Sequence, residues 1–266
     1  MTQSPGVLFE RLVEIMSRLR GPDGCPWDRE QTRVSLKPYL LEEAYEVLEA
    51  IEAGAPAAVE EELGDLLFQV VFHAQVGTEA DEFTMSTVLQ RLIDKMVERH
   101  PHVFGDAHVA TSGDVLVQWE AIKQQEAERQ GRRRSVIDGV PRALPSLLRA
   151  QRLQSKAARV NFDWPSAQAA WAKVEEEIEE ARGALATGDR ARLEDELGDV
   201  LFSVVNVARL SSIDAEEAMR GAIEKFRRRF TEMEDDLSAR GKSVGGVTQE
   251  ELEQSWTAVK AQERGR

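Results

Sequence analysis

Cysteine is almost absent from this chain of 266 residues, which carries only Cys25. A single cysteine cannot form an internal disulfide, so packed cores must stabilise the fold. The lack of disulfides is typical of proteins in the reducing cytoplasm. The chain also lacks an apolar run long enough to span a bilayer, and its N-terminus lacks the basic start, apolar core and cleavage site of a secretory signal. We therefore expect a cytoplasmic protein with no membrane partner.

Basic residues are too few to balance the acidic ones. The 34 Lys and Arg residues face 48 Asp and Glu residues, which gives a formal net charge of -14. Sequence-independent binding of nucleic acid needs a basic surface, so this balance argues against a nucleic-acid partner. Histidine is also scarce, with 4 residues, three of which crowd between positions 100 and 108.

No alternating apolar and polar pattern persists for more than a few residues, which argues against β-strands. Apolar residues instead recur at spacings of three and four, as on one face of an α-helix. One such stripe comprises Leu63, Leu66, Leu67, Val70, Val71 and Ala74, and its counterpart comprises Leu197, Val200, Leu201, Val204, Val205 and Ala208. The sequence therefore predicts an all-α protein.

The two stripes belong to an internal repeat. The segment ELGDLLFQVVFHAQ at residues 62–75 matches ELGDVLFSVVNVAR at residues 196–209. Two basic and aromatic pairs recur in the same order: Lys95 with Arg99 matches Lys225 with Arg229, and Trp119 with Lys123 matches Trp256 with Lys260. These matches predict two duplicated, diverged helical-bundle domains. We place them at residues 1–130 and 147–266, joined by a linker at 131–146 that is rich in Gly, Pro and charge.

Each half carries a dense set of carboxylates on a predicted helical hairpin. The separation from Glu46 to Glu62 equals that from Glu180 to Glu196, sixteen positions in each case. Helical spacing places the carboxylates of each helix on one face, and a short connection makes the two helices antiparallel neighbours. The two sets are Glu42, Glu43, Glu46, Glu62 and Asp65 in the first half, and Glu176, Glu177, Glu180, Glu196 and Asp199 in the second.

Such carboxylates repel one another unless a cation neutralises them. Oxygen ligands alone favour a hard cation, Mg²⁺ first and Mn²⁺ second, and Mg²⁺ commonly keeps positions for substrate phosphates. A solvated acidic face is the simpler alternative for one such motif, but the repetition on two helices in both halves favours a metal site. A di-iron bundle is disfavoured because neither hairpin contains a Glu-x-x-His pair.

Several of these segments resemble the MazG family of nucleoside triphosphate pyrophosphohydrolases in its tandem-domain bacterial form. They are CPWDREQT, LEEAYEVLEAI, RHPHVFGD, GVPRALPSLLRAQRLQSKAARVNFDW and the two repeated segments above, which together cover nearly the whole chain. The resemblance implies an all-α NTP pyrophosphatase fold and a homodimer. It also implies Mg²⁺-dependent hydrolysis of NTPs, and of dNTPs, to the monophosphate and pyrophosphate.

The resemblance also implies roles for single residues. Glu177, Glu180, Glu196 and Asp199 would hold the metal, with Glu176 beside them, and the five carboxylates of the first half would form a second possible metal site. One carboxylate would orient or deprotonate the attacking water. Lys225 and Arg229 would bind the leaving pyrophosphate, and Trp256 with Lys260 would bind the nucleotide.

Two differences between the halves predict which one is active. Arg192 stands four residues before Glu196, where the first half has Ala58, and Asn206 stands ten residues after Glu196, where the first half has Phe72. Arg192 would help to neutralise a triphosphate, and Asn206 would hydrogen-bond a sugar or base. We therefore expect most of the activity in the second half.

The first half keeps all five acidic positions, so it could be weaker, regulatory, structural or directed at another nucleotide. Two alternatives apply to the whole chain. One is a house-cleaning hydrolase selective for noncanonical nucleotides, since pocket shape decides base choice. The other is a nonenzymatic nucleotide sensor or partner-binding protein.

Overall fold

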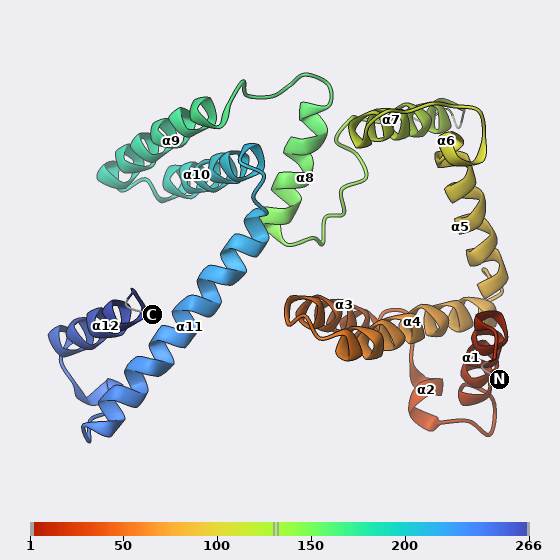
Figure 1. The fold of residues 1–266 in the computed structure, drawn as a ribbon, viewed down its shortest axis with the longest axis horizontal. Helices are drawn as coiled ribbons and strands as arrows, with labels where there is room; N and C mark the ends of the chain where they lie inside the picture. The colour runs from red at the N-terminus through yellow and green to blue at the C-terminus, as the bar shows by residue number, and fades with distance from the viewer. Residues whose placement is uncertain (1–2, 130, 132, 265–266) are drawn as a thin grey trace. The chain divides into compact units, whose positions relative to one another are not determined.

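The computed structural model describes residues 3–129, 131 and 133–264, and within these ranges every regular element is a helix (Figure 1). The all-α prediction is confirmed. Among the described residues, no helix is both long enough and apolar enough to cross a membrane. The chain divides into two compact units, Met1–Ile122 and Lys123–Arg266, with the boundary inside the seventh helix.

The first unit is built mainly around a hairpin of two helices, α3 and α4, which lie side by side in Figure 1. The turn contains Gly54, whose φ of 63° suits glycine, and Pro56 opens α4, where the missing N–H leaves no helical bond unmade. The helices that begin in this unit are α1 (Pro5–Leu19), α2 (Pro26–Glu30), α3 (Lys37–Glu52), α4 (Pro56–Glu79), α5 (Met85–Arg99), α6 (Pro101–Phe104) and α7 (Ser112–Arg129).

The core of the first unit forms where α1 packs on α4. Its fully buried side chains are Met16, Leu36, Val71 and Phe72. Phe72 is only 1% exposed and packs edge-on against Phe68, with ring centroids 5.9 Å apart. This core depends on a large aromatic side chain at position 72.

The second unit repeats the hairpin with α9 and α10 (Figure 1). Gly188 ends α9 in the left-handed conformation, at φ 70°, and Asp189 caps α10 by accepting a hydrogen bond from the Arg192 N–H at 3.1 Å. Helix α8 packs on α10, as α1 packs on α4 in the first unit. The helices of this unit are α8 (Ser146–Ala158), α9 (Ala167–Thr187), α10 (Arg190–Leu210), α11 (Ala215–Ala239) and α12 (Gln249–Arg264), with a 3-10 turn at Val244–Gly246.

The apolar stripes of α4 and α10 are only partly buried. Val71 and Ala74 on α4 and Val205 on α10 lie in the cores, as the spacing predicts. Other members of the stripes are exposed: Leu63, Leu67 and Val70 on α4, and Leu197, Leu201 and Val204 on α10. The stripes are therefore wider than the surface that one hairpin and its covering helix bury.

A buried arginine side chain links the C-terminal ends of α1 and α4. The Arg20 side chain is 6% exposed and donates to both Glu79 oxygens, with its Nε 2.9 and 3.0 Å from them. These hydrogen bonds hold the pKa of Glu79 below its ordinary value. A lowered carboxylate pKa stabilises the fold above the ordinary value, and this stability is lost as the pH falls through the folded-state pKa.

Glu79→Gln is therefore expected to lower the free energy of unfolding by about 1 kcal/mol at pH 7, a small value because solvent screens the pair. The difference from the native protein should shrink as the pH falls below the ordinary pKa of glutamate and vanish below the lowered folded-state pKa of Glu79. Urea unfolding at several pH values measures it. Glu82→Gln, which breaks the exposed pair with Arg33, is the control and should change little. The assignment would be contradicted if the free energy of unfolding of Glu79→Gln fell in acid as steeply as that of the native protein.

Candidate functional site

The acidic residues of the α9–α10 hairpin converge on one point. Glu177 on α9 and Glu196 and Asp199 on α10 each place a carboxylate oxygen within 4.8 Å of the others. Glu177 is 5% exposed, which is unusual for a charged side chain and requires a partner. The hairpin therefore forms a compact carboxylate cluster from both of its helices.

Electrostatic repulsion is strong in this cluster. The Glu196 carboxylate is the main cause of a raised pKa at Glu180, followed by partial burial and Glu177. Partial burial, followed by repulsion from Glu177, raises the pKa of Asp199. Four side chains that offer only carboxylate oxygens, two of them with raised pKa values, have the donor chemistry of a site for a hard divalent cation.

Lys173 is a site residue that the sequence interpretation missed. Its Nζ lies 2.7 Å from Glu177 Oε1 and 2.7 Å from Glu176 Oε1. Hydrogen bonds to Glu176 and then Glu177 raise the pKa of Lys173, so it stays charged. The signal was present in the sequence, because a lysine four residues before Glu177 lies on the same helical face, and the first half has Tyr39 there.

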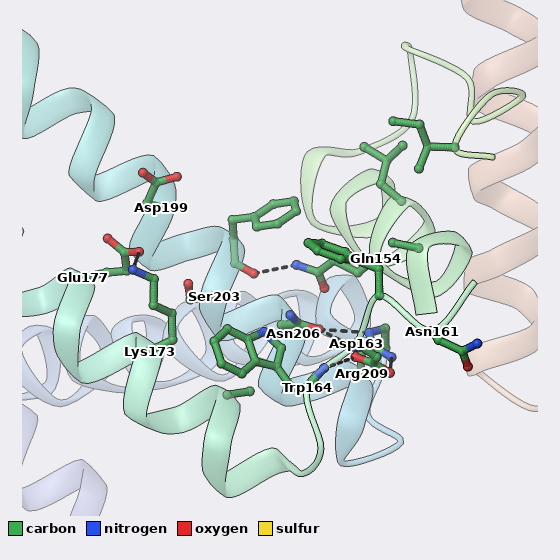
Figure 2. A pocket seen from close by; sticks show the side chains of 16 residues that line it. Gln154, Asn161, Asp163, Trp164, Lys173, Glu177, Asp199, Ser203, Asn206 and Arg209 are labelled. Carbon is green, nitrogen blue, oxygen red and sulfur yellow. Dashed lines mark hydrogen bonds and ion pairs between the residues drawn. The ribbon is translucent and has the colours of Figure 1, made fainter. Parts of the chain in front are cut away.

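The carboxylate cluster borders a cavity of about 640 Å³ within the second unit (Figure 2). Glu177, Asp199 and Lys173 lie at one side of it, and Figure 2 shows Gln154, Asn206 and Arg209 at the other. The lining comes from α8, α9, α10, the segment between α8 and α9, and Ile137 before α8: Ile137, Leu153, Gln154, Ala157, Asn161, Phe162, Asp163, Trp164, Ala170, Lys173, Glu177, Asp199, Phe202, Ser203, Asn206 and Arg209. Its size falls in the range of about 300–1,000 Å³ that small-molecule sites occupy.

Asn206 lines this cavity, and a network of hydrogen bonds fixes the orientation of its side chain. Its Oδ1 accepts from Arg209 Nε at 3.0 Å and from a terminal nitrogen of Arg209 at 2.6 Å. Arg209 in turn donates to Asp163, and this bond holds the pKa of Asp163 below its ordinary value. The ion pair therefore orients an amide that the sequence singled out as a sugar or base contact.

Two other predicted residues lie at the edge of the cluster. Arg192 Nε is 3.2 Å from Glu196 Oε1, so its charge faces the carboxylates, as the comparison with Ala58 suggests. Glu176 is exposed and pairs with Lys173. Glu176 is not one of the three side chains whose oxygens converge within 4.8 Å.

The predicted substrate contacts on α11 and α12 do not line the cavity in the described part of the chain. Arg229 Nε donates to Glu263 at 2.7 Å, and Trp256 packs against Phe226 with ring centroids 5.5 Å apart. Lys225 is exposed on α11, and Lys260 is half-buried on α12. The fold thus brings together the carboxylates, Arg192 and Asn206, but not these four residues.

The first unit has a corresponding carboxylate cluster. Glu43, Glu62 and Asp65 also place oxygens within 4.8 Å of one another. Partial burial, followed by Asp65 and Glu46, raises the pKa of Glu43, and partial burial with Glu46 raises that of Glu62. Glu42 and Glu46 are exposed beside them. This second cluster therefore shares the geometry but has Tyr39 in place of a lysine and a buried Phe72 in place of Asn206.

Comparison with known proteins agrees with this arrangement of two similar sites. The family model of the MazG nucleotide pyrophosphohydrolase domain matches residues 31–104 and 166–233, which contain the two clusters. A nucleoside triphosphate pyrophosphohydrolase of Escherichia coli K12 is 47% identical over 258 residues, covering 96% of this chain and 98% of the relative.

Two further relatives extend the comparison. A nucleoside triphosphate pyrophosphohydrolase/pyrophosphatase MazG of Thermotoga maritima is 44% identical over 255 residues, 96% of each chain. A nucleoside triphosphate pyrophosphohydrolase of Mycobacterium tuberculosis is 40% identical over 158 residues, 58% of this chain and 46% of the relative. With both domain matches and full-length relatives, the chain belongs to the MazG nucleotide pyrophosphohydrolase family, in its tandem form.

Proposed function

We propose that the protein hydrolyses nucleoside triphosphates to the monophosphate and pyrophosphate, and that the second unit carries most of this activity. The observation that supports this assignment is the junction of a convergent carboxylate cluster with a cavity of small-molecule size. The E. coli and T. maritima relatives are named for the same reaction. The first unit would be weaker, regulatory or structural.

The carboxylates Glu177, Glu180, Glu196 and Asp199 would hold Mg²⁺, with Mn²⁺ as a substitute. The cluster fits such an ion because all its donors are carboxylate oxygens that lie close together. The pKa of Glu180 is raised mainly by Glu196, and that of Asp199 is raised by burial and then by Glu177. When bound, the ion supplies charge neutralisation for the phosphates. A second possible metal site would use Glu43, Glu46, Glu62 and Asp65, with Glu42 beside them.

The chain's own residues would then position the triphosphate and the water. Lys173 and Arg192 already face the carboxylates and would carry positive charge toward the phosphates. One carboxylate of the cluster would orient or deprotonate the attacking water. Contacts of Lys225 and Arg229 with pyrophosphate, and of Trp256 and Lys260 with the nucleotide, rest on family resemblance alone.

The exposed part of the apolar stripes supports a homodimer. Leu197, Leu201 and Val204 on α10 are followed on α11 by exposed Met219, Ile223 and Phe226, which share one helical face. Exposed apolar side chains at helical spacing mark an association surface. Light scattering after size exclusion measures the mass in solution, and a monomer at micromolar concentration would contradict this proposal.

Lys173→Met is expected to lower kcat/KM for ATP with saturating Mg²⁺ by about 10- to 100-fold, because the phosphates lose a cation beside the cluster. The matched control is Tyr39→Met at the corresponding position of the first unit, which should leave turnover unchanged. Steady-state assay of pyrophosphate release measures both variants. If Lys173→Met left turnover unchanged, as Tyr39→Met is expected to, Lys173 would have no role in the reaction.

Product analysis tests the assignment itself. The purified protein is incubated with each NTP and dNTP and Mg²⁺, and the products are separated by ion exchange. Pyrophosphate with monophosphate supports the proposal, whereas orthophosphate with diphosphate replaces it with a phosphohydrolase. Absence of any product would favour a nonenzymatic nucleotide sensor. Strong turnover of only noncanonical nucleotides would favour a house-cleaning hydrolase.

A further inference from the structure

A buried glutamine on α8 lines the far side of the cavity, opposite the carboxylate cluster (Figure 2). Gln154 is 6% exposed, and its Nε2 donates to the Phe202 carbonyl oxygen of α10 at 2.8 Å. A carbonyl can only accept, so the orientation of the Gln154 amide is fixed by chemistry. Its Oε1 is then a buried acceptor, with no partner among the described residues.

An unsatisfied buried acceptor is costly, so this atom requires an explanation. The Gln154 side chain lines a cavity that a ligand can fill, and a donor group on that ligand would satisfy Oε1. A methionine or leucine would fill the same space without the cost if packing were the only requirement. The orientation of Gln154 therefore points to a ligand that carries a hydrogen-bond donor.

Asn206 supplies the complementary group on the same cavity. Arginine can only donate, so the two bonds from Arg209 require that the Asn206 oxygen face Arg209. The Asn206 Nδ2 group is left as a donor. The cavity thus offers one acceptor from α8 and one donor from α10.

Aromatic side chains complete the lining. Trp164 and Phe202 belong to the same cavity and provide apolar faces against which a flat ring can stack. Lys173, Glu177 and Asp199 lie at its other side, where the phosphates are proposed to bind. A nucleotide matches this arrangement, because it has a flat polar ring at one end and phosphates at the other.

The geometry points to Gln154 and Asn206 as the residues that bind the nucleobase, with Gln154 Oε1 accepting from a base N–H and Asn206 Nδ2 donating to a neighbouring base acceptor. This inference rests on the proposed function. Each of the common bases has a donor beside an acceptor on its pairing edge, such as the amino group and N1 of adenine. The pair therefore selects bases that carry a donor and discriminates only weakly among the common ones.

The first unit lacks this arrangement. The position that corresponds to Asn206 is Phe72, which is fully buried with Met16, Leu36 and Val71. This position therefore belongs to an apolar core in the first unit and to a polar cavity lining in the second. Base recognition of this kind would be confined to the second unit.

The test replaces Gln154 with methionine, which keeps the volume and removes the acceptor. Gln154→Met should lower kcat/KM for ATP about 10-fold, mainly through KM, because one hydrogen bond to the base is lost. The substrate purine riboside 5′-triphosphate lacks the amino group of adenine, so native protein and variant should hydrolyse it equally. Gln69→Met is the matched control, because Gln69 is also a buried glutamine but lies in the first unit. It should not change either rate.

Equal losses of activity on both substrates would overturn the inference, because they would indicate a structural role for Gln154. So would an unchanged rate on ATP. Calorimetric titration with α,β-methylene ATP and its purine riboside analogue measures the same contrast as affinity. This titration separates the two proposals: if no pyrophosphate is released but the contrast in affinity persists, the proposed reaction fails and the base site stands. Thermal melting of each variant checks that it is folded.

Discussion

Asp199→Asn is expected to reduce the kcat for pyrophosphate release by about 1,000-fold or more while the protein stays folded. The change removes one charged oxygen donor from a cluster in which three side chains converge within 4.8 Å. A weakened metal site loses its stabilisation of the charge on the phosphates, which is among the largest single contributions to catalysis of this kind. Steady-state assay with ATP over a range of Mg²⁺ concentrations measures both the maximum rate and the metal requirement.

Stability distinguishes this loss from misfolding. Burial and repulsion from Glu177 raise the pKa of Asp199, so its charge is unfavourable in the folded protein without metal. A carboxyl group with a raised pKa destabilises the folded protein above its folded-state pKa. Below its ordinary pKa it is protonated in both the folded and the unfolded protein and does not change the stability. Asp199→Asn should therefore melt at the same temperature as the native protein or higher at pH 7 without Mg²⁺. A large drop in melting temperature would invalidate the activity measurement.

The matched control is Asp65→Asn in the first unit, which breaks the corresponding cluster of Glu43, Glu62 and Asp65. Because the first cluster has no lysine at position 39 and a core residue at position 72, this variant should retain most of the turnover. If Asp65→Asn abolished activity and Asp199→Asn did not, the assignment of the two units would be reversed. Equal losses would indicate that both sites contribute to the measured rate.

The hairpins and their carboxylates could be predicted from sequence because their determinants are local. Helical spacing places Glu177 on the same face of its helix as the other carboxylates of that helix. Gly54 and Gly188 mark the turns of the two hairpins, and the repeat shows which residues recur in both halves. Lys173 could have been predicted from the sequence as well, because it lies one helical turn before Glu177. A comparison of the two halves at every position on this face would have found it.

The cavity could not be predicted in the same way. Its walls come from Ile137, α8, α9, α10 and the segment 161–164, and only tertiary packing brings Gln154 next to Phe202. The sequence shows a glutamine in an amphipathic helix, where an exposed position is the usual expectation. The stripes also suggested more burial than a single chain provides, because periodicity identifies an apolar face but not what covers it.

The difference between Phe72 and Asn206 affects the fold of the first unit as well as its site. The comparison with Asn206 predicts that the first unit lacks a hydrogen bond to substrate. The structure adds that Phe72 is 1% exposed and central to the core of that unit. Restoring asparagine at position 72 would therefore not simply restore a site, because the core around Met16 and Leu36 would lose its largest member.

Phe72→Ala is accordingly expected to destabilise the first unit by about 3–5 kcal/mol, the usual cost of removing a buried phenylalanine. Hydrogen exchange resolved by peptide should show the loss of protection in α1 and α4, with α9 and α10 unchanged. Turnover of ATP should persist, because the second unit holds the proposed site.

Asn206→Ala is the matched variant, with the opposite expectation: a small change in protection and a clear rise in KM. Its side chain lines a cavity, so its removal leaves no void in a packed core. If Phe72→Ala abolished turnover while α9 and α10 kept their protection, the first unit would have a direct part in the reaction. The two variants thus separate what position 72 does for the fold from what position 206 does for the substrate, although both residues occupy the same place in the repeat.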